Sequence, residues 1–310
     1  MMKEQKNTKP WGLIIFVLLV LFLLSMIFAG IISLSSEIDV ELLAGNVALI
    51  PVKGVITVDP ASGWGESVAS STEIIEFIEK AGKNPKIKAI ILDINSPGGS
   101  AVASEEIAVA VKKANKTTVA LIREVGASGG YWVASAADQI VANRMSITGS
   151  IGVFSSYLEF SGLLRDYNVT YQRLVSGEYK DMGSPFKELT QDERNLLQNK
   201  LDRIHIYFIN EVAANRGISP EQVETLSTGA FYLGIEAKEL GLVDVLGGKQ
   251  EAIDIVEKKL NITAELAKYE KRKTLFDVLG EVMNQRSFHL GRGIGSSMYG
   301  SETDRLKVWA

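Results

Sequence analysis

The stretch IKAIILDINSPGGS, residues Ile87 to Ser100, decides the fold of this 310-residue chain. Its first half, Ile87–Ile94, is a nearly continuous apolar run, which is typical of a strand covered by helices on both faces of a parallel sheet. Its second half is polar and rich in glycine. Because this loop follows the strand directly, we expect it at the carboxyl edge of the sheet, where open α/β sheets bind ligands.

Apolar strands alternate with amphipathic helices on both sides of this stretch. Strands are expected at Val47–Val52 and Thr117–Ile122, with helices at Glu73–Lys83 and Ala103–Ala114. This β-α-β-α order predicts an α/β fold with a mostly parallel sheet layered with helices. A long amphipathic helix is expected further along, from Thr190 to about residue 215.

The overall pattern divides the chain into four parts. We expect a polar N-terminus at residues 1–10, an apolar segment at 11–34, the α/β domain at 45–260 and an irregular C-terminal tail at 261–310. The net charge of -4 and the pI near 5.5 argue against nucleic acid as the main partner. The chain has no cysteine, which excludes a disulfide framework and a thiolate metal site.

Residues 11–34 are almost all apolar and carry no charge. About 20 apolar residues span the hydrocarbon core of a bilayer, so this segment predicts a transmembrane helix. Lys3, Lys6 and Lys9 precede it, and positive charges favour the cytoplasmic side. A cleaved signal peptide is the alternative, but its apolar region is usually about 7–15 residues long. We therefore expect a single-pass membrane protein whose α/β domain is extracellular.

A second glycine-rich loop, Gly126-Ala-Ser-Gly-Gly130, follows the next strand and opens a helix. A serine at such a turn can act as a nucleophile, and glycine amides can stabilise an oxyanion. Ser128 is the candidate nucleophile, with the Gly98-Gly99 loop close by. The alternatives are an ordinary helix cap at Ser128 and an ordinary turn at Pro97-Gly-Gly99.

Ser128 has no histidine placed to serve as its base, since the chain contains only His205 and His289. A lysine can replace histidine in this role, and Lys180 in the run GEYKD is the candidate. It follows a run at Val169–Val175 that is expected to form a strand. A lysine that acts as a base must be neutral, so its pKa must fall from about 10.4 to about 7–8. The carboxylate of Asp181 would oppose that change and is expected to point elsewhere. The alternative is a solvated loop lysine.

A short motif, Thr148-Gly-Ser-Ile-Gly152, lies between the candidate serine and the candidate lysine. Its hydroxyl groups could orient a lysine amine. The alternative is a simple turn between two strands.

Together these motifs resemble the signal peptide peptidase A family, in its short, single-copy form from Gram-positive bacteria. The family shares the ClpP/crotonase superfamily fold. The ClpP branch uses a histidine base, whereas Val153 stands at the corresponding position here. The matching motifs, in the family's order, are INSPGGS (residues 94–100), ASGGYW (127–132), TGSIG (148–152), GEYKDMGSP (177–185) and GLVD (241–244).

The resemblance implies a role for each candidate residue. Ser128 is implied as the nucleophile, Lys180 as the general base and Ser150 as the residue that orients the lysine amine. The backbone amides of Gly99 and Gly129 are implied as the oxyanion hole. No metal or cofactor is expected.

The resemblance also implies an assembly and a substrate. Family members form a homo-oligomer, an octamer for the short form, in which each active site is built where neighbours meet. The expected function is a membrane-anchored serine endopeptidase that degrades remnant signal peptides and other hydrophobic peptides.

Two other functions remain open at this stage. A crotonase-like enzyme acting on acyl-CoA could use the same oxyanion geometry, although it would need an acidic base and a cytosolic location. A non-catalytic, membrane-bound crotonase-like scaffold would use the glycine loops only as turns, so that loss of Ser128 would change nothing.

Overall fold

The computed structural model describes residues 11–35, 45–59 and 68–270. The chain divides into two units, one formed by Met1–Leu42 with Lys271–Ala310 and the other by Leu43–Glu270. The second unit contains all the candidate site residues. We refer to its sheet and the helices packed on that sheet as the body.

Helix α1 (Trp11–Ser35) is the described part of the first unit, and its sequence carries no charged residue. The structure describes its side chains over residues 14–30, where every residue is exposed. Counted over described residues, the chain contains no helix that is both long and apolar enough to cross a membrane. The transmembrane anchor at residues 11–34 therefore stays a prediction.

The body is built on one sheet with the strand order β10-β1-β4-β5-β6-β9, in which all neighbours are parallel. At the carboxyl end of β5, a short strand β7 continues the sheet and pairs in turn with an antiparallel strand β8. A second small sheet joins β2 to β3 in parallel. The strands are β1 (Val47–Lys53), β2 (Val55–Thr57), β3 (Val68–Ser70), β4 (Ala89–Ser96), β5 (Thr117–Ala127), β6 (Gln139–Ala142), β7 (Ile147–Gly149), β8 (Phe231–Leu233), β9 (Val245–Leu246) and β10 (Leu266–Lys268).

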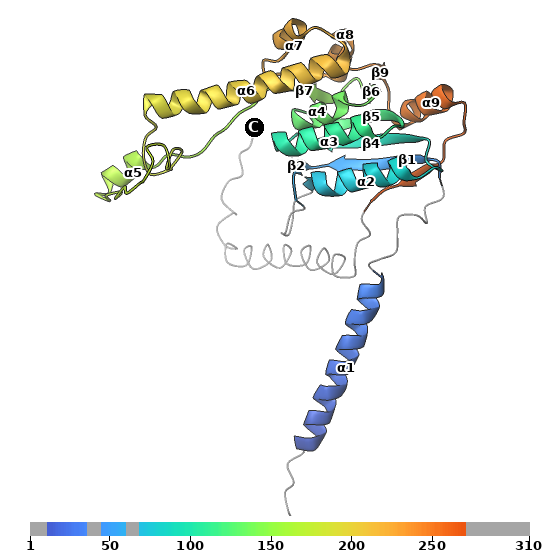
Figure 1. Cartoon of the computed structure of the whole chain (residues 1–310), viewed down its shortest axis with the longest axis horizontal. Helices are drawn as coiled ribbons and strands as arrows, with labels where there is room; N and C mark the ends of the chain where they lie inside the picture. The colour runs from blue at the N-terminus through green and yellow to red at the C-terminus, as the bar shows by residue number, and fades with distance from the viewer. Residues whose placement is uncertain (1–10, 36–44, 60–67, 271–310) are drawn as a thin grey trace, which may run out of the picture. The chain divides into compact units, whose positions relative to one another are not determined.

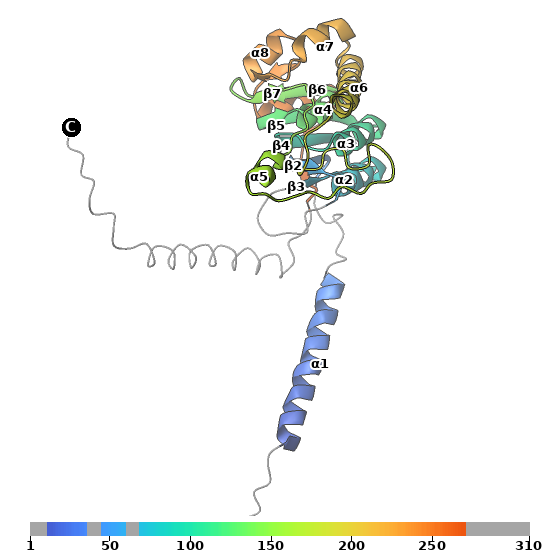
Figure 2. The same cartoon turned by 90° about the vertical axis from the view of Figure 1, so that its left-hand side faces the viewer.

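Helices cover both faces of this sheet. The helices α2 (Ser71–Lys83), α3 (Ala101–Lys113) and α4 (Gly129–Ser135) lie together on one face (Figures 1 and 2). On the other face, α9 (Lys249–Leu260) packs Ala252 and Val256 against fully buried strand residues. A strand covered on both faces must be apolar on both, which explains the continuous apolar run of β4. This mixed α/β architecture fits the ClpP/crotonase-like fold.

The long helix α6 (Gln191–Arg216) begins at a capping box between Thr190 and Glu193 and ends at Gly217, which is left-handed with φ 65°. Its second half packs on α4, where the Phe208 ring stacks on Trp132 with centroids 4.6 Å apart. Its first half buries only Glu193. The remaining helices are α5 (Ser161–Asp166), α7 (Pro220–Leu226) and α8 (Gly234–Glu239).

The sheet continues past residue 260, where the sequence predicted an irregular tail. Strand β10 pairs in parallel with β1, with Leu266 opposite Val47 and Lys268 opposite Leu49. The run around residues 264–268 is too short to reveal a strand by its own pattern, because only the neighbouring strand makes it one. The compact unit that contains the sheet extends to Glu270.

Candidate active site

Ser128 occupies a sharp turn between β5 and α4. Its backbone has φ 52° and ψ −122°, which is uncommon for a residue other than glycine. The turn is fixed by two hydrogen bonds, from the Ser128 N–H to Gly149 O (2.8 Å) and from the Trp132 N–H to Ser128 O (2.9 Å). Although Ser128 stands at the cap position of α4, its side chain makes no capping hydrogen bond. A strained strand-to-helix turn that exposes a serine hydroxyl is a common way to present a nucleophile.

The glycine loop after β4 lies directly against this turn. A Cβ atom added at Gly98 would lie 2.8 Å from Ser128 Cβ and 2.7 Å from Gly129 N. A Cβ atom at Gly129 would lie 3.3 Å from Gly99 N. These distances place the two candidate amides, of Gly99 and Gly129, beside each other and next to Ser128.

The loop is held so that the Gly99 amide remains unused. The Ile56 N–H donates to Gly98 O and the Ser100 N–H donates to Ile56 O, both at 2.8 Å. This parallel bridge between Ile56 and Gly99 uses the carbonyl of Gly98 and the N–H of Ser100, and it does not use the N–H of Gly99. Within the described residues, neither the Gly99 nor the Gly129 amide donates a backbone hydrogen bond. Two unpaired amides that converge beside a serine can stabilise an oxyanion.

Ser150 follows β7, which pairs with the end of β5 so that Gly149 lies opposite Ala127. The structure therefore brings Ser150 next to Ser128 in register. Ser150 also has a positive φ, 50°. Its N–H donates to Ala230 O (3.0 Å) and its hydroxyl donates to Gly229 O (3.1 Å).

Lys180 comes from a different part of the chain, since the turn that carries it is joined by ion pairs through Asp181 and Lys187 to Glu193 at the start of α6. It lies in the segment between β7 and α6, residues 151–190, which we call the arm and which Figure 1 shows extending outward along the first half of α6. Lys180 is exposed, and no hydrogen bond or ion pair of its ammonium is found among the described residues. The sequence predicted a strand at Val169–Val175, but no strand forms there, because no other part of the described chain pairs with this run.

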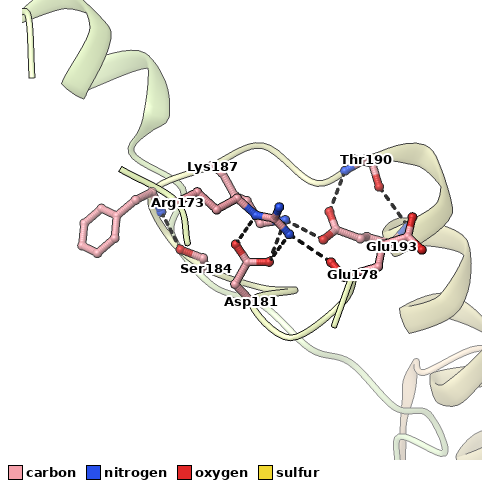
Figure 3. Close-up of polar contacts among 8 residues, drawn as sticks. Arg173, Glu178, Asp181, Ser184, Lys187, Thr190 and Glu193 are labelled. Atoms are coloured by element: carbon pink, nitrogen blue, oxygen red, sulfur yellow. Dashed lines mark hydrogen bonds and ion pairs between the residues drawn. The ribbon is translucent and has the colours of Figure 1, made fainter. Parts of the chain in front are cut away.

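The arm carries a compact set of ion pairs next to Lys180 (Figure 3). Asp181 accepts two hydrogen bonds from Arg173, of 2.7 and 2.9 Å, and lies 3.7 Å from Lys187 Nζ. Lys187 Nζ also contacts Glu193 Oε1 at 2.5 Å. As expected from the sequence, the Asp181 carboxylate is therefore directed to other cations.

These contacts shift the pKa values of the groups involved. The hydrogen bond from Arg173 is the main cause that lowers the pKa of Asp181, and the same bond raises the pKa of Arg173. The hydrogen bond from Lys187 is the main cause that lowers the pKa of Glu193. Both carboxyl groups therefore remain charged at neutral pH.

The arm also exposes large apolar side chains. Leu174 is 96% exposed and Phe154 is 87% exposed. Many exposed large apolar side chains on one segment are typical of a surface that binds another protein. The other exposed apolar residues of the arm are Tyr157, Leu158, Phe160, Leu163, Tyr167, Val169, Tyr171, Val175, Tyr179 and Phe186.

Sequence patterns did not indicate Arg173 or Lys187, since each is a single basic residue in an unpatterned stretch. Both become recognisable only through their contacts with Asp181. Within the described ranges, no group of three or more histidine, aspartate or glutamate side chains is arranged to hold a metal ion.

Comparison with known families supports a peptidase. The model of peptidase family S49 matches residues 110–263, a range that includes Ser128, Ser150 and Lys180 and excludes Gly99. A putative protease of Methanocaldococcus jannaschii is 33% identical over 93% of this chain and 95% of its own length.

Two further relatives carry more specific names. A putative signal peptide peptidase SppA of Enterococcus faecium is 34% identical over 78% of this chain and 73% of its own length. Protease 4 of Haemophilus influenzae is 34% identical over 70% of this chain but only 35% of its own length.

Proposed function

Because this chain belongs to peptidase family S49, the family of signal peptide peptidase A, and is a serine-type peptidase, we propose that Ser128 is its nucleophile and Lys180 its general base. The observation that carries the first assignment is the strained turn of Ser128. Its hydroxyl is left out of the helix cap, and the unpaired amides of Gly99 and Gly129 lie beside it.

The proposed reaction is an acyl transfer. The neutral amine of Lys180 takes the proton of the Ser128 hydroxyl as Oγ bonds to the carbonyl carbon of a peptide. The resulting oxyanion accepts hydrogen bonds from the Gly99 and Gly129 amides. The C–N bond then breaks, and the Lys180 ammonium gives its proton to the leaving amine. In the second half of the reaction, Lys180 takes a proton from a water molecule as the water oxygen bonds to the acyl carbon. The bond between that carbon and Ser128 Oγ then breaks, and Lys180 returns the proton to Oγ.

We assign Lys180 to the active site of a neighbouring copy. Two features support this assignment: the arm that carries Lys180 is exposed, and it presents large apolar side chains such as Leu174 to solvent. A homo-oligomer, an octamer in our proposal, would cover these side chains and bring Lys180 to Ser128 of the next copy. Ser150 would then orient the incoming amine by exchanging its bond to the Gly229 carbonyl for one to Lys180.

The proposed substrates are remnant signal peptides and other hydrophobic peptides. The name of the Enterococcus faecium relative supports this substrate class. We propose that residues 11–34 anchor the chain in the cell membrane in a single pass, with residues 1–10 cytoplasmic and the body extracellular. This location would place the body where such peptides accumulate.

The experiment that tests the function is hydrolysis of fluorogenic peptides by the full chain in detergent, with alanine or leucine before the scissile bond. Ser128→Ala and Lys180→Ala should each abolish turnover, whereas Lys200→Ala, which removes an exposed lysine of α6, should not. The rate should rise toward alkaline pH, because only the neutral amine can accept a proton. Retention of activity in either dyad variant, or a rate independent of pH, would contradict the assignment.

A further inference from the structure

One guanidinium group closes the turn that carries Lys180 on both sides. Arg173 donates to the carbonyl oxygen of Glu178 (2.9 Å), just before Lys180, and to both oxygens of Asp181, just after it (Figure 3). Two bonds to one carboxylate fix the angle between the groups as well as their distance. The backbone closes the same turn, because the Lys180 N–H donates to Gly177 O (3.1 Å).

The closed turn is connected to the start of α6. Lys187 Nζ lies between Asp181 Oδ1 (3.7 Å) and Glu193 Oε1 (2.5 Å). The second oxygen of Glu193 accepts from the Thr190 N–H (2.9 Å), and the Glu193 N–H donates to Thr190 Oγ1 (3.2 Å). A continuous series of polar contacts therefore runs from the Lys180 turn into the capping box of α6.

Burial separates this network from an ordinary surface ion pair. The Asp181, Lys187 and Glu193 side chains are 13%, 17% and 4% exposed, and Arg173, which lies over them, is 40% exposed. On the same arm, the pair of Arg165 and Glu188 is 72% and 70% exposed. Water screens an exposed pair so that it contributes little, whereas shielded groups that share partners hold one geometry. The two carboxylates and two cations of the network also balance in charge.

We propose that Arg173 and Asp181 are positioning residues for Lys180, which they hold in one orientation at the end of the arm. The inference rests on the proposed function, in which Lys180 takes the proton of Ser128. Catalysis of this kind requires accurate placement, since a misplacement of about 1 Å can cost about 100-fold in rate. The pairing with Arg173 and Lys187 also keeps the Asp181 carboxylate from forming an ion pair with Lys180 itself.

The kinetic test compares Arg173→Gln and Asp181→Asn with wild type in the full-length enzyme. Each single variant should lower kcat about 10- to 100-fold with KM within about twofold of wild type. The alkaline midpoint of the rate should rise in Arg173→Gln, because the unpaired carboxylate favours the ammonium form of Lys180. The midpoint should fall in Asp181→Asn, because the positive charges of Arg173 and Lys187 are then no longer neutralised and disfavour the ammonium form of Lys180. Opposite shifts within one ion pair are a signature that mere loosening of the fold would not produce.

The matched control is Arg165→Gln, which removes an exposed ion pair from the same arm. It should leave kcat and the midpoint unchanged, and Arg173→Lys should recover part of the lost kcat. Hydrogen exchange supplies a readout that does not depend on activity: the amides of residues 177–184 should lose protection in Arg173→Gln and keep it in Arg165→Gln.

The outcomes separate the inference from the function on which it rests. Inactive Ser128→Ala and Lys180→Ala enzymes beside unchanged Arg173→Gln and Asp181→Asn enzymes would overturn the positioning role and leave the function standing. Hydrolysis that does not depend on Ser128 would overturn the proposed function, and the positioning role with it. Unchanged exchange in Arg173→Gln would overturn the closure of the turn by this residue.

Discussion

Ser128 and Lys180 lie in parts of the molecule that are built differently. Ser128 lies in the body, where the surrounding backbone leaves no room even for a methyl group at Gly98. Lys180 lies on the arm, where neighbouring side chains such as Leu174 are almost fully exposed. The body fixes its residue by close packing and by backbone hydrogen bonds, and the arm does so by ion pairs.

Our proposal divides the active site between copies of one chain. Ser128 and the unpaired amides of Gly99 and Gly129, which form the proposed oxyanion side, lie together in a single chain. Lys180, the proposed base, lies on an exposed turn that ion pairs join to α6. Each half can therefore be disturbed separately, and the two should respond differently.

The largest expected effect concerns the division itself. Ser128→Ala and Lys180→Ala should each lower activity by at least about 1000-fold. Coexpression of the two variants should restore about a quarter of wild-type activity, because random assembly of a symmetric oligomer rebuilds that fraction of intact sites. Peptide hydrolysis by the purified mixture measures this recovery.

The control for this mixture is Ser128→Ala coexpressed with the Ser128→Ala/Lys180→Ala double variant, which should stay inactive. If the first mixture assembles but recovers no peptide hydrolysis, both residues of the dyad act within one chain.

The next effect separates a crowded glycine from an open one. A Cβ atom at Gly99 would lie 2.1 Å from Ile56 O, so Gly99→Ala must displace the loop and its amide. We expect hydrolysis to fall about 100- to 1000-fold, as for loss of an oxyanion donor. On the arm, nothing lies within 4 Å of a Cβ at Gly162 in α5, so Gly162→Ala should keep full activity. Equal activity of the two variants would argue against the Gly99 amide as a donor.

A third comparison concerns stability. Phe208 is 2% exposed and stacked on Trp132, so Phe208→Ala should lower the free energy of unfolding by about 3–5 kcal/mol. Leu174→Ala should change the stability of the dissociated chain by less than about 0.5 kcal/mol, and it should weaken assembly. Denaturant unfolding and sedimentation velocity measure the two quantities. A strongly destabilised Leu174→Ala monomer would show that the arm packs within its own chain.

The smallest effect is confined to acidic pH. The pKa values of Asp181 and Glu193 are lowered in the folded chain, so their ion pairs stabilise the arm above the ordinary carboxyl range near about 4. That contribution is lost as the pH falls through the lowered values. Amide signals of residues 177–187 should therefore stay constant from neutral pH to about pH 4 and change below it. A transition between pH 5 and 7 would contradict the network, and Asp181→Asn should remove the part of the acidic transition that comes from Asp181 and leave the part that comes from Glu193.

The sequence predicted most of the body because its patterns are local. The apolar run of β4 and the glycine turns can be recognised within a few residues, and the amphipathic pattern from Thr190 predicted α6. It predicted a strand at Val169–Val175 wrongly, because alternating apolar residues meet the rule for a strand even where no partner strand exists.

The candidate site divides in the same way. The glycine turns placed Ser128, Gly99 and Gly129 at one sheet edge, and the structure brings these residues together. The contacts of Arg173 and Lys187 could not be predicted, since they depend on how an irregular segment folds over itself. The place of Lys180 could not be predicted either, because its turn is joined to α6 by the ion pairs of Asp181, Lys187 and Glu193, which leave no pattern in the sequence.

The pairing of β10 with β1 has a practical consequence for protein engineering. Because the two strands are parallel neighbours and Val47 lies opposite Leu266, the first and last strands of the body begin side by side at one outer strand pair, with β4 between that edge and the strand that leads to Ser128. Domains with adjacent ends tolerate insertion into a host loop and circular permutation. The body could therefore be inserted into another protein or attached to a surface through either end. The point of attachment would then lie at an edge of the sheet that β4 separates from the strand leading to Ser128.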